Sequence, residues 1–399
     1  MDTARLSAAA RFVPFAYGFR PFFLAAGWYA LIAVSAWLWI YTSGAAALGD
    51  LPPHLWHGHE MLFGFIGAAI AGFMLTAVPS WTGSRGFAGA PLITLATIWL
   101  AGRLAFMAVG SIPVPLLALL ELAFMPALAA TIAPPLLREG NRNTPLLLVL
   151  GVLWAADAVF VYAALVRGDI VPATTALYTA LNTILLLITI IGGRIVPAFT
   201  TNALKQQGIV GVVRTHRWVE RLVIPTMAVA VIVDVFASQT LLSAAVAAVA
   251  AFAHAVRLIG WRGTYTLSQP IVWVLHAAYA WLPLGLVLKA VYLSTGASWA
   301  AQWAHALTIG AAATMVMAVM TRAALGHTGR PLVVARPIAI AYGLLIAGAA
   351  VRVFGPAMLP AHYTWTVIAS AILWIGAFAL YVVVYTPILV RPRVDGRPG

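Results

Sequence analysis

The sequence predicts an all-α protein that crosses a membrane about twelve times, and three observations lead to that prediction. Of its 399 residues, 63% are hydrophobic and 8% are charged, with a mean hydropathy of +0.97. These values lie far outside the usage of soluble globular proteins. Apolar runs of the ~20 residues that a membrane-spanning helix needs recur along the whole chain. Lys and Arg gather between those runs, as they do in cytoplasmic loops of membrane proteins.

Twelve apolar runs, separated by polar residues, Gly or Pro, give the expected helices in chain order. They cover residues 22–42, 57–79, 91–110, 115–137, 145–166, 174–196, 217–237, 240–260, 271–293, 300–322, 335–354 and 364–388. The longest polar stretch, Thr200 to Arg217, is expected to be a short basic loop. We therefore expect residues 1–399 to form a single transmembrane domain without a soluble insertion.

The ends of three expected helices resemble one another. The second leaves through Gly72–Pro79, the sixth through Gly193–Thr200 and the tenth through Ala318–Arg322. These exits lie four helices apart, so the bundle has two readings: one unrepeated array, or three four-helix units.

The distribution of basic residues predicts the orientation. With the N-terminus placed in the cytoplasm, all of the 23 Lys and Arg residues fall at cytoplasmic ends and loops except Arg103, Arg167, Lys289 and Arg352. This bias predicts an even number of helices with both termini in the cytoplasm. It also accounts for the net charge of +13 without a nucleic-acid partner.

The absence of cysteine limits the cofactor chemistry. Disulfides, thiolate-ligated haem, Cys-ligated iron–sulfur clusters and covalent c-type haem attachment are all excluded. Any metal must be held by His, Met, carboxylate or backbone groups.

The start of the second helix carries an unusual group of imidazoles: His54, His57 and His59, followed by Glu60. Imidazoles are costly beside hydrocarbon and are common ligands of haem and transition metals. His57 and Glu60 share a helix face, whereas His59 points nearly opposite, so one regular helix cannot direct both rings at one metal. Either one histidine serves elsewhere or the helix is irregular near Gly58. Glu60 is expected to hold an imidazole tautomer as hydrogen-bond acceptor.

The tenth helix supplies a partner for that group. His305 begins this helix from the same membrane face as the second-helix histidines. A haem between the two helices would take His305 as one axial ligand and His57 or His59 as the other. The alternative for each residue is a solvated histidine at a helix start.

Polar residues toward the cytoplasmic face allow a second site. His254 and His276 lie near the inner ends of adjacent helices, where they form a second metal site or pair with each other. His327, within Leu325–Arg330, is either functional or part of a polar turn.

Two arginines also have alternative readings. Arg103 either forms an internal ion pair with Glu121 or anchors an anionic cofactor group such as a propionate. Arg194 is either a basic boundary residue or part of a polar pocket.

These motifs together resemble the NnrS family. The resemblance rests on His54–Met61 with Gly64 and Gly72–Pro79, and on Tyr17–Phe23. It continues in Gly192-Gly193-Arg194 with Pro197, Leu275–Leu282, His305-Ala306, Thr321-Arg322 and Leu325–Arg330. Carried over residue by residue, the family's polar positions fall on His57, His59, Glu60, His276, His305, Arg322 and His327.

The resemblance implies a function that hydropathy does not. It implies a polytopic protein of the bacterial inner membrane with haem b and copper, linked to denitrification and nitrosative stress. Nitric oxide or a nitrosyl-iron species would be its ligand, copper would be held by His276 with His254 and His327, and an unidentified donor would supply electrons. Whether the protein is a nitric oxide oxidoreductase is left open. The alternatives are a twelve-helix secondary transporter and a non-catalytic haem or metal sensor.

Overall fold

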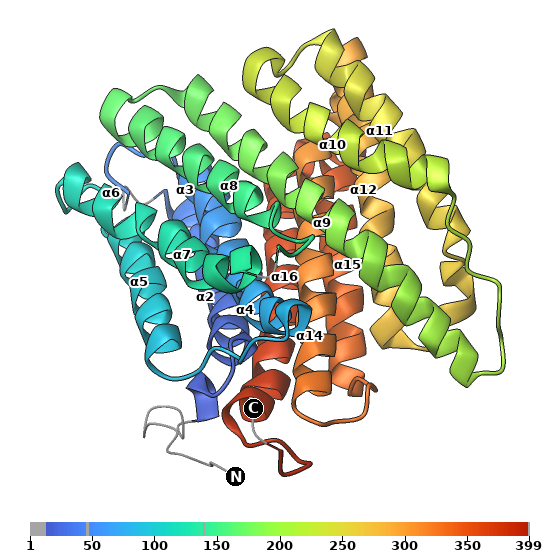
Figure 1. Ribbon diagram of the computed structural model, residues 1–399. Coiled ribbons are helices and arrows are strands. Elements are labelled where there is room, and N and C mark those ends of the chain that lie inside the picture. The colour runs from blue at the N-terminus through green and yellow to red at the C-terminus, as the bar shows by residue number, and fades with distance from the viewer. Residues whose placement is uncertain (1–12, 45–47, 139, 398–399) are drawn as a thin grey trace. The chain divides into compact units, whose positions relative to one another are not determined.

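The computed structural model describes residues 13–44, 48–138 and 140–397. All regular structure in those residues is helical, as Figure 1 shows, with no strand. The helices up to the fifth apolar run are α2 (Phe19–Ser43), α3 (Pro53–His59) continued by η2 (Glu60–Ile66) and α4 (Gly67–Thr82), α5 (Ala90–Met107), α6 (Val114–Leu122) with α7 (Phe124–Arg138), and α8 (Leu146–Val161) with η3 (Tyr162–Arg167). The later helices are α9 (Ile170–Gln206), α10 (Arg217–Ala237), α11 (Leu241–Gly260), α12 (Pro270–Thr295), α13 (Trp303–His305) continued by η6 (Ala306–Ala313) and α14 (Thr314–His327), α15 (Arg336–Met358) and α16 (Tyr363–Val390).

This arrangement confirms the predicted fold class. Among the described residues, 11 helical segments are long and apolar enough to cross a membrane. The twelfth predicted helix is α10, which is 21 residues long and carries Arg217, Glu220, Arg221 and Asp234. The chain is therefore a multi-pass membrane protein, and the predicted helices agree with the observed ones within a few residues at most ends.

The end of the sixth predicted helix was placed wrongly. The loop expected from Thr200 begins only after α9 ends at Gln206. Thr200 and Thr201 lie within the helix, where their hydroxyls donate to the carbonyl oxygens of Val196 and Pro197, both at 2.8 Å. Polar side chains that bond to their own helix are compatible with a helical backbone, so the polar sequence did not mark the helix end.

Two of the transmembrane segments contain a π-helical stretch directly after a histidine. His59 ends α3 and η2 follows, while His305 ends α13 and η6 follows. A π-helix takes more residues per turn than an α-helix, so it shifts the faces on which the next side chains lie, and such stretches often occur at functional sites. The irregularity expected near Gly58 is therefore present, beginning two residues later at Glu60.

The chain divides into two compact units. The first unit comprises the described residues up to Ala180 together with Met320–Leu332 and from Phe378 onward. The second unit comprises Leu181–Val319 and Val333–Ala377. The expectations of one domain and of three four-helix units stay predictions, and the two units are described separately below.

Of the basic residues used to predict orientation, Arg5 and Arg11 lie outside the described residues.

Candidate functional site

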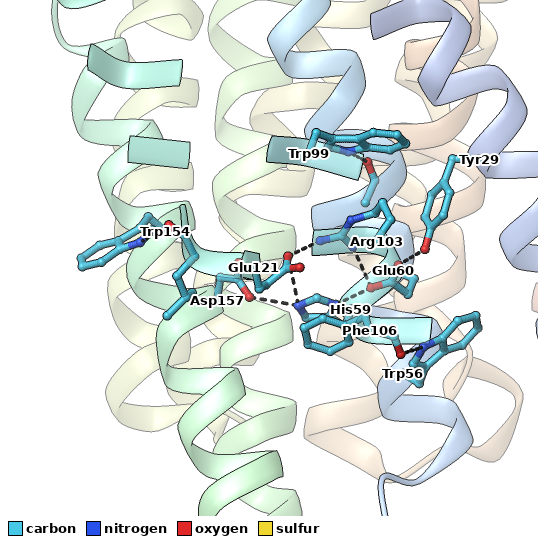
Figure 2. Close-up of polar contacts among 12 residues, drawn as sticks. Tyr29, Trp56, His59, Glu60, Trp99, Arg103, Phe106, Glu121, Trp154 and Asp157 are labelled. Carbon is cyan, nitrogen blue, oxygen red and sulfur yellow. Dashed lines mark hydrogen bonds and ion pairs between the residues drawn. The ribbon is translucent and has the colours of Figure 1, made fainter. Parts of the chain in front are cut away.

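The first unit contains a buried cluster of five ionisable side chains. His59 comes from α3, Glu60 from η2, Arg103 from α5, Glu121 from α6 and Asp157 from α8. Figure 2 shows these side chains converging from their helices. Each residue is at most 3% exposed. We call this group the buried cluster.

The first two members are neighbours in the sequence, and their side chains meet. In a regular α-helix, neighbouring side chains point about 100° apart and would diverge. Here His59 Nδ1 lies 2.8 Å from Glu60 Oε1. The helical wheel had placed Glu60 on the face of His57, but the imidazole that Glu60 holds is that of His59.

Both ring nitrogens of His59 are engaged by carboxylates. On the other side of the ring, Nε2 lies 2.9 Å from Asp157 Oδ1 and 3.8 Å from Glu121 Oε1. The ring is held flat against Phe106, with centroids 3.7 Å apart and planes 12° apart, and Phe160 stacks at 4.8 Å. These contacts fix the direction of both nitrogens.

Arg103 joins the carboxylates of two helices. Its Nη1 donates to Glu60 Oε1 at 2.7 Å, and its Nη2 donates to Glu121 Oε1. The ion pair expected between Arg103 and Glu121 is thus present, and a second one reaches Glu60. Both terminal nitrogens of Arg103 are engaged by the chain's own acids, which makes an internal role a better fit than anchoring a propionate. Tyr29 donates its hydroxyl to Glu60 Oε2.

Two glycines make room for this cluster. A Cβ at Gly64 would lie 2.5 Å from the Tyr29 ring and 3.0 Å from Arg103 Nη1. At Gly102 it would lie 2.7 Å from Glu121 Oε2. The absence of a side chain at these positions lets α5 and α6 approach closely enough for the ion pairs to form. The Gly64 carbonyl also accepts a hydrogen bond from Trp99 at 3.1 Å.

The charges in the cluster do not balance. It holds three carboxyl groups and one guanidinium, inside helices built to lie in hydrocarbon. One acidic side chain near the centre of a membrane helix costs about 2.5–3.5 kcal/mol in insertion. Charged groups at such depth usually pair or mark functional sites. Arg103 offsets one negative charge, so the rest must be offset by protons or by a cation.

The second unit contains a separate hydrogen-bonded chain. Glu220 accepts from Arg257 Nε at 2.8 Å, and Arg257 Nη1 donates to the Tyr279 hydroxyl at 3.0 Å. The same hydroxyl lies 2.7 Å from His254 Nδ1. His254 is fully buried, and its Nε2 has no hydrogen-bond partner among the described residues.

His276 is held in a similar manner. Its Nε2 lies 2.8 Å from Thr200 Oγ1, while its buried Nδ1 has no partner among the described residues. His254 and His276 are thus both oriented by a hydroxyl rather than hydrogen-bonded to each other. Each presents one further ring nitrogen to the protein interior.

The remaining predicted site residues are spread over the two units. In the first unit, His57 is half-buried with its ring 4.5 Å from that of Trp37, and His327 stacks with Tyr17 at 6.0 Å. Arg322 lies on α14 in the same unit. His305 and Arg194 belong to the second unit, where Arg194 is exposed on α9.

Sequence reasoning missed the role of Asp157 and of Tyr29. Neither residue was among the site residues expected from the sequence. The available signal was the scarcity of acids within the apolar runs: Glu121 and Asp157 are the only acids in α6 and α8. A transmembrane acid needs a partner, and both acids find one in this cluster.

Comparison with known proteins gives one family. Residues 13–393 match the model of a family described as NnrS protein. A search of curated proteins finds no match.

Proposed function

Because the chain belongs to the NnrS family, we propose that it binds haem b and copper in a bacterial inner membrane and binds or processes nitric oxide. The observation that carries the proposal is the family match over residues 13–393, which includes every polar motif residue noted above. The multi-pass helical fold supports it, since a small apolar gas can reach a membrane-embedded site laterally. Haem iron would supply the position at which nitric oxide binds.

On the second apolar segment, His57 fits an axial haem ligand better than His59. Both nitrogens of His59 are within hydrogen-bond distance of carboxylates, so the ring could reach a haem only by leaving Glu60 or Asp157. His57 lies outside the buried cluster, beside Trp37. We therefore propose His57 as the haem ligand on this segment, and we keep His305, which directly precedes η6 in the other unit, as a separate candidate haem ligand.

His276 fits a copper ligand because of its tautomer. Thr200 has one hydroxyl proton, which it donates to the Val196 carbonyl at 2.8 Å. On this assignment His276 Nε2 donates to Thr200 Oγ1, and the neutral ring carries a lone pair on its buried Nδ1. A metal-binding imidazole is typically oriented in this way through its other nitrogen.

His254 fits the copper site less well than His276. Tyr279 already accepts from Arg257, and its own proton finds an acceptor in His254 Nδ1. His254 Nε2 then carries a proton and is a donor rather than a ligand. We therefore propose that copper uses His276, with His254 as a nearby polar group, and the part expected of His327 stays a prediction.

Spectra and metal analysis of the purified full-length protein test this proposal. We expect a b-type Soret band that His57→Ala and His305→Ala abolish or shift, whereas the exposed control His54→Ala leaves it unchanged. His276→Ala should lose copper and keep the haem spectrum, with exposed His216→Ala as its matched control. A folded, colourless protein without copper would overturn the proposal. Unchanged spectra in both haem variants would overturn the ligand assignment alone.

A further inference from the structure

The starting observation is the proton count around His59. Each of its ring nitrogens lies within 2.9 Å of a carboxylate oxygen, Nδ1 at Glu60 and Nε2 at Asp157. Two close nitrogen–oxygen contacts need two shared protons, and a neutral imidazole carries only one. The trio therefore holds one extra proton, either on the imidazole or on one of the acids.

That extra proton does not neutralise the cluster. Glu60, Glu121 and Asp157 carry three negative charges when ionised, and Arg103 with the extra proton offsets two of them. One negative charge remains within helices that lie in hydrocarbon. If a divalent cation took the place of the proton between His59 Nε2 and Asp157, the total charge would be zero.

The geometry of the donor atoms fits such an ion. His59 Nε2, one oxygen of Glu121 and one of Asp157 all lie within 4.8 Å of one another. Two atoms that are each about 2.1 Å from one metal ion lie roughly 3–4 Å apart. The separations here are 2.9 Å from His59 Nε2 to Asp157 Oδ1 and 3.8 Å from His59 Nε2 to Glu121 Oε1.

A further observation concerns the second oxygen of Glu121. Glu121 Oε2 is buried and has no hydrogen-bond partner among the described residues. The guanidinium of Arg103 donates to Glu121 through Oε1. A buried carboxylate oxygen without a donor is costly, and a bound cation would satisfy it.

The residues around His59 hold its ring in the orientation that a metal ligand needs. With Nε2 on the ion, the remaining proton of His59 lies on Nδ1 and is accepted by Glu60, in the carboxylate–histidine–metal arrangement of many sites. Arg103 and Tyr29 hold Glu60 in turn. The imidazole is also fixed by stacking on Phe106.

We propose that His59 Nε2, Glu121 and Asp157 bind one divalent first-row transition ion in exchange for the proton shared by His59 and Asp157. One imidazole and two carboxylates, without a sulfur ligand, favour ions such as Mn(II), Fe(II) or Zn(II) over Cu(I). The site is distinct from the haem and copper positions proposed above and does not depend on them. Glu60 and Arg103 act as positioning residues.

Titration with Co(II) tests the proposal. Full-length protein without a histidine tag, stripped with a chelator, is titrated in weak buffer while bound cobalt and released protons are measured. We expect the wild type to bind one Co(II) more than Asp157→Asn, with about one proton released for that ion. Glu121→Gln should give the same loss and serves if Asp157→Asn fails to fold. Glu60→Gln should weaken binding about 10–100-fold without changing the stoichiometry.

Two controls separate this site from others. The double variant Asp234→Asn with Lys289→Met removes a buried acid of the second unit together with its counter-charge, and His276→Ala removes the proposed copper ligand; both should keep the cobalt ion that Asp157→Asn loses. The proposal is overturned if wild type and both cluster variants bind equal amounts of Co(II). Binding that depends on Asp157 but releases no proton would overturn the exchange.

Discussion

Arg20, at the start of α2, donates its Nη1 to the carbonyl oxygen of Leu389, near the end of α16, at 2.7 Å. The same nitrogen donates to Arg391 at 2.9 Å. Arg20 is fully buried, and all three residues belong to the first unit. The first helix therefore begins where the last one ends, as expected for twelve crossings with both ends of the chain on one side of the membrane.

This contact leads to a prediction about topology. With the basic residues placed inside, reporter fusions at Arg397 and at Arg85 should both report a cytoplasmic position. Green fluorescent protein and alkaline phosphatase fusions at the same two points give opposite signals and check each other. A periplasmic signal at either point would contradict the orientation.

The C-terminal tail is docked by a contact that predicts its pH dependence. Arg393 donates from Nη1 to the His327 carbonyl at 2.7 Å and from Nε to Asp395 Oδ1 at 2.9 Å. The hydrogen bonds from Arg393 lower the pKa of Asp395 below its ordinary value. Because the pKa of Asp395 is lower in the folded protein than in the unfolded chain, ionised Asp395 stabilises the docked tail above the ordinary carboxyl pKa of about 3.9. This stabilisation is lost only as the pH falls below that value.

We therefore expect the tail to stay docked from pH 8 down to about pH 5 and to loosen at more acidic pH. The backbone amide of Val394, which donates to the Thr328 carbonyl, reports this as its hydrogen-exchange protection factor. In Asp395→Asn, protection should already be reduced at pH 7. Release of the tail with a midpoint near pH 6 would contradict the conclusion that ionised Asp395 holds it in place.

Gly193 on α9 is predicted to tolerate no side chain. An added Cβ would lie 1.8 Å from Arg257 Nη2, and Arg257 is held by Glu220, Tyr279 and the Thr189 carbonyl. Moving the guanidinium would break these bonds, so Gly193→Ala should cost about 1–3 kcal/mol and lower the thermal midpoint.

The neighbouring Gly192 provides the control for this change. Its added Cβ would meet nothing closer than the Tyr279 ring at 3.7 Å. Gly192→Ala should be neutral or stabilising, because alanine is favoured over glycine within a helix by about 0.5–1 kcal/mol. Equal destabilisation by the two substitutions would argue against the Arg257 contact as the cause.

The comparison of sequence and structure shows which inferences hydropathy supports. The helices were predictable because burial in hydrocarbon imposes a minimum apolar length. The pairing of Arg103 with Glu121 was predictable because the two lie at similar depth on consecutive helices. The position of Asp157 beside His59 was not, since these residues are 98 positions apart and hydropathy carries no information on which helices are neighbours.

The choice of imidazole beside Glu60 was left open by the sequence. A helical wheel assumes 3.6 residues per turn, and on that assumption Glu60 shares a face with His57. The backbone keeps this register up to Glu60, whose N–H donates to the Trp56 and His57 carbonyls, yet Glu60 Oε1 lies beside His59 Nδ1. A helical wheel carries no information on side-chain conformation, so the composition of the cluster required the structure.

A buried ion pair in the second unit gives the last prediction. Asp234 Oδ2 accepts from Lys289 Nζ and from Asn182 Nδ2, and its Oδ1 accepts from Ser243 at 2.5 Å. Both charged residues are 2% exposed. Replacing only Lys289 leaves a buried carboxylate without a counter-charge, which costs about 3–5 kcal/mol, whereas removing both charges costs much less.

Lys289→Met should therefore lower the thermal midpoint more than the double variant Asp234→Asn with Lys289→Met. Both are measured in the same detergent, so differences between them reflect the pair and not the micelle. The reason for the order is electrostatic: the double variant keeps a hydrogen-bonding side chain at position 234 but no net charge, and the contacts with Asn182 and Ser243 can persist. If the double variant were as unstable as the single one, the pair would stabilise the fold through the packing of the lysine stem rather than through its charge.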